Sequence, residues 1–126
     1  MFETGAYANR VPLVIGTNDQ WEAATMGFQN IGPNYWKGEE GRKGLLDGTA
    51  KYTDAPYVAT WAALASWAPY LPEGFEAVKY ADSQQLFTLG KAAIYPTGSW
   101  EIFTFEKDAQ FELGIFPPPV EAAGDT

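Results

Sequence analysis

The stretch Phe87–Trp100, FTLGKAAIYPTGSW, constrains the fold of this chain more than any other stretch. It predicts the end of a helix, a short buried strand over Ala92–Tyr95, and a tight turn that contains a glycine. Pro96 has no N–H to offer to a strand ladder, so the strand should end at that residue. The turn then brings Trp100 to the start of a helix predicted over Trp100–Lys107. The chain should therefore contain a strand–turn–helix unit with an indole at the mouth of a sheet.

A second unit of the same kind is predicted near the N-terminus. Residues Val11–Ile15, VPLVI, are apolar on both faces and are followed by a glycine, which predicts a strand covered on both sides. The turn TNDQW, residues Thr17–Trp21, comes next, and its capping-box spacings predict a helix that continues to Asn30. A third strand is predicted over Phe111–Phe116, FELGIF, because the proline run 117–119 stops an apolar segment there.

The clearest amphipathic helix is predicted over residues 54–68. Asp54 suits an N-cap, and Pro56 suits the first helical turn, where no N–H is needed. Apolar side chains recur at helical spacing and predict a buried face made of Tyr57, Val58, Trp61, Leu64, Ala65 and Ala68. Glycine, proline and charged residues predict a surface excursion over Ile31–Gly44 and an exposed loop over Leu71–Ala81.

The alternation of strands and helices indicates an α/β layer architecture, with a largely parallel sheet flanked by helices. The chain has 126 residues, a normal length for a single domain with a substantial core. Its five Trp, seven Tyr and eight Phe exceed what such a core needs, so some of these rings should face a ligand or a partner.

Composition argues against several classes of function. The net charge is −8 and no basic run occurs, which disfavours nucleic acid as a partner, because nucleic acids are bound through Lys and Arg. The chain has no Cys and no His, so it cannot form a disulfide, a thiolate or imidazole metal site, or a Ser/His/Asp triad from its own residues. The turns that contain glycine match neither the GxxxxGK(S/T) nor the GxGxxG spacing of phosphate-binding loops. No acidic stretch has the EF-hand pattern of a calcium site. These observations predict a binding protein without metal or cofactor, rather than an enzyme.

No apolar run approaches the roughly 20 residues that a membrane-spanning helix needs. The first ten residues, MFETGAYANR, do not have the basic and then apolar pattern of a secretion signal. The chain is therefore expected either to be cytoplasmic or to have lost a leader.

Two turns are the candidate binding elements, because ligands of open α/β sheets lie beyond the carboxyl ends of the strands. The first turn is Thr17–Trp21 and the second is Thr97–Glu101, and each combines an indole with polar side chains and free N–H groups. An indole face suits the C–H-rich side of a pyranose, and Asp or Asn can take its hydroxyls. The predicted ligand-binding residues are Asn18, Asp19, Trp21, Gly98, Ser99 and Trp100.

Each of these residues also has a purely structural interpretation. Either tryptophan can pack on its own sheet, and Asp19 can serve only as a helix N-cap. Glu101 is expected to offset the dipole at the start of its helix. Trp61 and Trp67 are expected to be core and helix-packing residues, and Trp36 is expected as either a loop anchor or a rim contact.

Four stretches resemble the extracellular solute-binding proteins of carbohydrate ABC transporters, the family that includes maltose-binding protein. FTLGKAAIYPTGSW is similar to that family's pattern of helix end, strand and G-x-W turn, and it is the most specific of the four. FELGIFPPP resembles the strand and proline exit that follow. VPLVIGTNDQW resembles an earlier strand and turn, and DGTAKYTDAPYVATWAALASW resembles the intervening helix.

The resemblance implies a fold like one lobe of a type II periplasmic-binding protein, with a sugar held between two lobes. Trp100 matches the stacking tryptophan of the family, and Asp19 and Trp21 match an acidic and an aromatic position of the earlier turn. Residues 1–126 would form part of the second lobe, without the first lobe or the C-terminal covering helices. A full-length protein of this kind would be periplasmic or extracellular, directed there by a signal or a lipid, and would deliver sugar to membrane permease subunits. A lobe without its covering helices should expose apolar surface and form a homodimer.

Two other functions remain open on the residues themselves. In a fragment of a carbohydrate-active enzyme, Asp19 and Glu101 would flank a glycosidic bond as paired acids. In a self-associating interaction domain, Trp21 and Trp100 would be buried against another copy of the chain.

Overall fold

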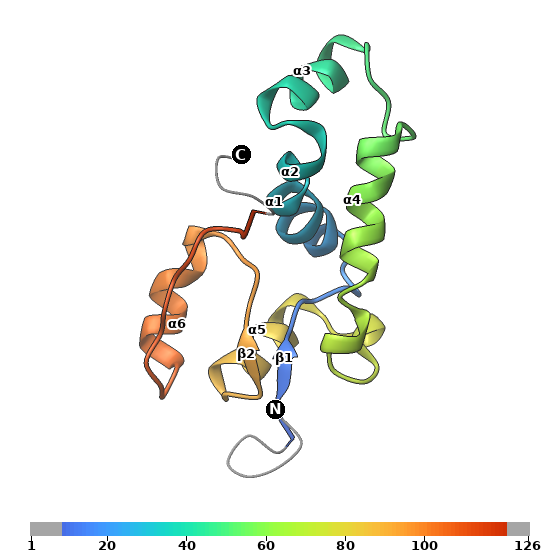
Figure 1. Ribbon diagram of the computed structural model, residues 1–126. Coiled ribbons are helices and arrows are strands. Elements are labelled where there is room, and N and C mark those ends of the chain that lie inside the picture. Colours follow the sequence, from blue (N-terminus) through green and yellow to red (C-terminus); the bar gives the residue numbers. More distant parts are fainter. Residues whose placement is uncertain (1–8, 121–126) are drawn as a thin grey trace.

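The structure is a computed structural model that describes residues 9–120 (Figure 1). The ends of the predicted 1–126 unit, residues 1–8 and 121–126, lie outside the described part. Within residues 9–120 the chain forms a mixed α/β arrangement of six α-helices and a two-stranded sheet. The strands are β1, Val11–Leu13, and β2, Ala92–Ile94. They run parallel, with Val11 opposite Ala92 and Leu13 opposite Ile94, so the predicted parallel pairing is confirmed.

The extent of the predicted sheet is wrong. Phe111–Phe116, predicted as a third strand, has no regular structure, and most of its residues are exposed. The ring of Phe111 packs edge-on against Phe87 with the ring centroids 5.6 Å apart, so it covers the core instead of lying in a ladder. Gly114 weakens a strand, and the proline run 117–119 has no N–H groups to donate.

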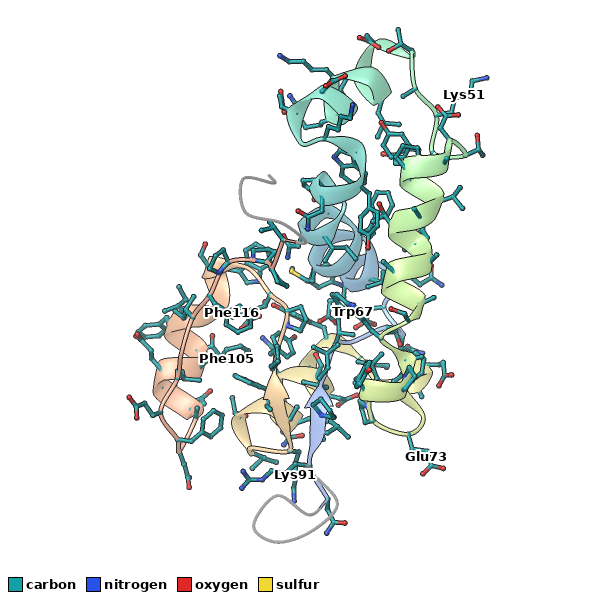
Figure 2. The ribbon with its side chains drawn as sticks, viewed as in Figure 1. Lys51, Trp67, Glu73, Lys91, Phe105 and Phe116 are labelled. Carbon is teal, nitrogen blue, oxygen red and sulfur yellow. The ribbon has the colours of Figure 1, made fainter. Side chains whose placement is uncertain are left out.

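The core lies where the two strands meet α5, Tyr80–Thr88, and α6, Ile102–Asp108. Both helices contribute phenylalanines, and Phe105, labelled in Figure 2, is the buried one of α6. The buried apolar cluster consists of Val14, Phe87, Ala92, Tyr95 and Phe105, with Val11, Leu86 and Leu113 packed against it. This cluster holds the carboxyl ends of both strands in place, and the two candidate turns start there.

The remaining helices extend away from the sheet (Figure 1). They are α1, Gln29–Ile31; α2, Pro33–Trp36; α3, Glu39–Asp47; and α4, Ala55–Ala65. The predicted surface excursion over Ile31–Gly44 does lie at the surface, where only Gly32 is buried, but it is helical, because α2 and most of α3 occupy it. Lys37 and Gly38 have positive φ values of 62° and 56°, and this reversal lets one short helix follow another. The predicted loop over Leu71–Ala81 contains a short 3₁₀ turn, Phe75–Ala77, and another precedes it at Ala68–Tyr70.

The helix after the first turn has an unusual pitch. The chain is helical from Trp21, but Ala23–Phe28 adopt a π-helix before α1 begins. Gln20 has a φ of 66°, and no side chain caps this helix. The predicted capping box is therefore wrong, and the Asp19 carboxylate accepts a hydrogen bond from the backbone N–H of Tyr80 instead.

The predicted buried face of α4 is only partly correct. Tyr57 is buried and Leu64 is half-buried, but the other members of the predicted face, Val58, Trp61, Ala65 and Ala68, are exposed. Thr60, which the pattern did not include, is fully buried. Helix α4 packs against α2 and the π-helical segment. The face of α4 that is buried is therefore narrower than the face that carries apolar side chains.

Candidate functional site

The two candidate turns leave the same edge of the sheet, because β1 and β2 are parallel and each turn follows the carboxyl end of its strand. One residue that was predicted to lie in a loop, Tyr80, contacts both turns. It is the first residue of α5, and its backbone N–H, ring and hydroxyl each contact a different candidate residue. Tyr80 is therefore the centre of the candidate site.

The first turn is fastened to the segment that leads into α5. The backbone N–H groups of Thr17 and Asn18 both donate to the carbonyl of Val78, at 3.0 Å each. The side chain of Asn18 donates to the carbonyl of Glu76 at 3.3 Å. Oδ2 of Asp19 accepts the N–H of Tyr80 at 2.8 Å. Asp19 thus caps α5, a helix distant in sequence, and Asn18 and Asp19 both have structural roles.

Trp21 is 41% exposed, and its indole contacts Tyr80. The two rings meet edge to face, with centroids 4.8 Å apart and planes at 65°. This geometry is favourable for aromatic pairs. The ring of Trp21 thus packs against α5 instead of its own sheet, while a large part of the side chain stays exposed.

The second turn places Trp100 over a glycine. The indole is 56% exposed, and its six-membered ring lies so close to Gly98 that a Cβ at this position would clash with the ring atom Cζ3. The φ of Gly98 is −104°, which any residue can adopt, so this position needs glycine for space and not for backbone freedom. Ser99 is exposed beside it and begins a 3₁₀ turn, Ser99–Glu101.

Hydrogen bonds join Trp100 to the protein through Tyr80. The indole Nε1–H of Trp100 donates to the Tyr80 hydroxyl at 3.1 Å. The Tyr80 hydroxyl in turn donates to Oε1 of Glu101, which also accepts Nε2–H of Gln84 at 2.7 Å. Glu101 is only 2% exposed, and it stands at the start of α6, a position that is compatible with the expected offset of the helix dipole. Burial raises the pKa of the Glu101 carboxyl.

A second buried carboxyl lies behind the first turn. Glu22 is fully buried, and its Oε1 accepts the Tyr95 hydroxyl at 3.1 Å. The Tyr95 hydroxyl lies 2.9 Å from Oγ of Ser83, which donates to the Tyr80 carbonyl at 2.7 Å. Burial raises the pKa of Glu22, mainly through the loss of water around the carboxylate. The backbone of Tyr80 is thus tied to the core as well as to both turns.

Sequence reasoning found both indoles but missed Tyr80, Gln84 and the burial of Glu101. Tyr80 and Gln84 are four residues apart and share one face of α5, and this spacing is a local signal for a pair. Nothing local connects that pair to residues 18–21 or 98–101. Of the two tryptophans expected in the core and in helix packing, Trp61 is 43% exposed but stacks on Phe28, so its helix packing is confirmed, and Trp67, labelled in Figure 2, is half-buried. Trp36 is half-buried and stacks on Tyr57, so it anchors helices rather than a loop.

The two turns form an open surface. Two grooves lie elsewhere, and neither Trp21 nor Trp100 lines them. One, of about 740 Å³, is lined by aromatic rings and α3. The other, of about 630 Å³, lies between the end of α5, β2 and residues 108–114. Trp21, Tyr80 and Trp100 therefore resemble one wall of a site rather than an enclosed pocket.

This surface offers flat apolar faces with polar groups at their edges. Such a combination suits a ring that has C–H bonds on its faces and hydroxyls around its rim. The two acids of the open enzyme hypothesis lie at opposite ends of Tyr80, since Asp19 binds its N–H and Glu101 binds its hydroxyl. Each acid already has a partner inside the protein.

The described residues hold no group of three or more Asp and Glu side chains placed for a metal ion. Among the same residues, no helix is long and apolar enough to cross a membrane. Comparisons with known protein families, with curated proteins and with solved structures found no match to this chain.

Proposed function

We propose that this chain is part of the substrate-binding component of a carbohydrate importer and contributes one wall of a sugar-binding cleft. Trp21 and Trp100 stack on the ligand, and the turns that carry them supply polar contacts through Asn18, Asp19 and Ser99. The fold would then be one lobe of a type II periplasmic-binding-protein arrangement, and the opposite wall would come from another lobe. The protein has no chemistry of its own in this proposal.

The observation that carries the proposal is the contact of both indoles with Tyr80. Two tryptophans from turns distant in sequence lie on one tyrosine, and each keeps a large part of its ring exposed. A purely structural pair would gain more by burying both rings. The six-membered ring of Trp100 also lies close to the backbone at Gly98, where there is no Cβ to displace it.

Sugar binding is tested by titrating oligosaccharides into a two-lobe protein that contains this chain, using calorimetry and tryptophan fluorescence. Trp100→Ala should weaken binding at least about tenfold, or roughly 1.4 kcal/mol, because the stacking face is lost. Phe103→Ala is the matched control, since Phe103 is 76% exposed and lies outside the site. Equal affinity of Trp100→Ala and the unsubstituted protein would remove Trp100 from the site.

The proposed partners include permease subunits and a second copy of this chain. Large apolar side chains are exposed on α6 and on the segment that follows it, with Phe103 76%, Ile115 77% and Phe116 62% exposed. Exposed apolar surface of this kind favours association. Sedimentation of the isolated chain should show a concentration-dependent dimer that Phe103→Ser together with Ile115→Ser weakens. A monomer at high concentration would contradict the dimer without affecting the sugar site.

A location outside the cytoplasm belongs to the same proposal, since an importer's receptor must meet its sugar before the membrane does. This location rests on the resemblance and on the proposed function.

A further inference from the structure

We infer that Glu101, acting through Tyr80, is the positioning residue that fixes the orientation of the Trp100 indole. The effect of this orientation on ligand affinity rests on the proposed sugar-binding function, whereas the orientation itself does not.

The direction of the hydrogen bonds follows from the donors present. An indole N–H can only donate, so the Tyr80 hydroxyl must accept from Trp100. The same hydroxyl has one proton, which it donates to Glu101. Glu101 Oε1 is therefore the terminal acceptor of a directed chain from Trp100 through Tyr80, and such chains strengthen each of their bonds.

Packing alone does not determine how the indole lies. Trp100 is 56% exposed, and the residue beneath it is Gly98, which has no side chain to grip the ring. The residues after Glu101, Ile102 and Phe103, are exposed as well. The bond from Nε1 to Tyr80 is the directional contact that selects one orientation of the ring.

Glu101 can act as a fixed reference because it is itself held. It is 2% exposed, and Gln84 donates to the same oxygen at 2.7 Å, so the carboxyl is bound from α5 while it stands at the start of α6. Tyr80 also contacts Trp21, which means that one residue sets the spacing between the two indoles. A ligand that needs both faces then meets a preorganised pair and does not have to immobilise the rings itself.

The test begins without any ligand. The indole N–H signals of the five tryptophans are recorded by NMR on the full chain, and Trp100→Phe identifies the Trp100 signal. Loss of a hydrogen bond worth about 1 kcal/mol should speed solvent exchange of that N–H roughly fivefold. Tyr80→Phe keeps the ring against Trp21 but removes the hydroxyl, so exchange should speed up in this variant. Tyr70→Phe, which removes a hydroxyl from a tyrosine that is 55% exposed, is the matched control and should change nothing.

Two substitutions at Glu101 separate its acceptor from its charge. Glu101→Gln keeps an acceptor oxygen of the same reach, and its exchange rate should stay within about twofold of the unsubstituted chain. Glu101→Leu removes the acceptor and should behave like Tyr80→Phe. If Glu101→Leu fails to fold by circular dichroism, Glu101→Ala, which also removes the acceptor, takes its place and should likewise speed the exchange of the Trp100 N–H.

Unchanged exchange in Tyr80→Phe, or equal acceleration in Glu101→Gln and Glu101→Leu, would overturn the inference. Affinity for an oligosaccharide, measured in the two-lobe protein, should follow the same order, with Glu101→Gln close to the unsubstituted protein and Tyr80→Phe roughly tenfold weaker. A paired-acid enzyme would instead lose its activity in Glu101→Gln. Absence of any saccharide binding would refute the proposed function. The NMR result would still test whether Glu101 orients Trp100 through Tyr80.

Discussion

Two groups of aromatic side chains in this molecule are held in different ways. In the Tyr80 group, made of Trp21, Tyr80 and Trp100, hydrogen bonds that end on a buried carboxyl hold Trp100, and Trp21 meets the Tyr80 ring edge to face. The Phe28 group, between α2, α4 and the π-helical segment, depends on ring contacts. Its members are Phe28, Trp36, Tyr52, Tyr57 and Trp61, and Phe28 stacks on Trp61 with centroids 4.5 Å apart. Ring packing stabilises without strict direction, whereas hydrogen bonds orient exposed rings. The first group is thus suited to recognition and the second to stability.

The largest expected effect is on the Phe28 group. Phe28 is 6% exposed and contacts three other rings. Phe28→Ala should lower the free energy of unfolding by roughly 3–5 kcal/mol, because it removes buried area and leaves a cavity. Urea denaturation measures this, with Phe28→Leu as the milder control. A loss below about 1 kcal/mol would show that the rings of this group are not a common support.

Each group contains a glycine that lies against an indole, Gly32 against Trp36 and Gly98 against Trp100, so the same substitution can be compared in both groups. A Cβ on Gly32 would clash with both the Trp36 ring and the backbone carbonyl of Phe28, whereas one on Gly98 would meet the Trp100 indole. Gly32→Ala must displace backbone inside the Phe28 group and should cost roughly 1–3 kcal/mol of stability. Gly98→Ala only pushes an exposed ring aside and should cost less than about 0.5 kcal/mol.

Gly98→Ala should be the more damaging of the two variants when saccharide affinity is measured instead of stability. Gly98→Ala should weaken saccharide affinity about tenfold, since the indole moves out of position, and Gly32→Ala should not. Chemical denaturation gives the stability of each variant, and calorimetry gives its saccharide affinity. Equal stability losses in the two variants would contradict the distinction between the groups.

The smallest expected effect is a pH dependence of the free energy of unfolding, which arises from the buried carboxyls near Tyr80. Burial raises the pKa of Glu22 above its ordinary value of 4.5, with a further contribution from Asp19, while the Tyr95 hydroxyl favours the charged form. The folded chain then binds the proton to a higher pH than the unfolded chain does. Stability is therefore fully present below about pH 4.5 and falls as the pH rises through the raised pKa. Burial of Glu101 raises the pKa of its carboxyl and acts in the same direction.

Urea denaturation from pH 4 to pH 8 measures this slope. Glu22→Gln should flatten part of it, because the amide does not titrate. Glu73→Gln, at an exposed loop position, serves as the control and should leave the slope unchanged. Identical slopes in both variants would mean that Glu22 does not contribute to the pH dependence.

The sequence predicted the features that depend on neighbouring residues. The apolar runs correctly predicted both strands. The turns that follow the strands correctly predicted that Trp21 and Trp100 are exposed. Helix α2 and the start of α3 were missed because Lys37 and Gly38 break the pattern locally, although the chain resumes a helix at once. The third strand was predicted wrongly because an apolar run does not reveal whether a strand partner is available to it.

The candidate site could be predicted only in part, for a related reason. Asp19 looks like a cap for its own helix and instead caps α5, and Tyr80 looks like a loop residue until both turns lie against it. Such roles depend on contacts between residues about sixty positions apart. No periodicity within a single element contains that information.

The pairing of β1 with β2 has a kinetic consequence. Val11 lies opposite Ala92, so most of the described chain lies in the loop that must close before the sheet exists. Loop closure of this kind is entropically costly and slows folding. Since the two turns meet only when this closure is complete, the Tyr80 group should be among the last parts of the molecule to form.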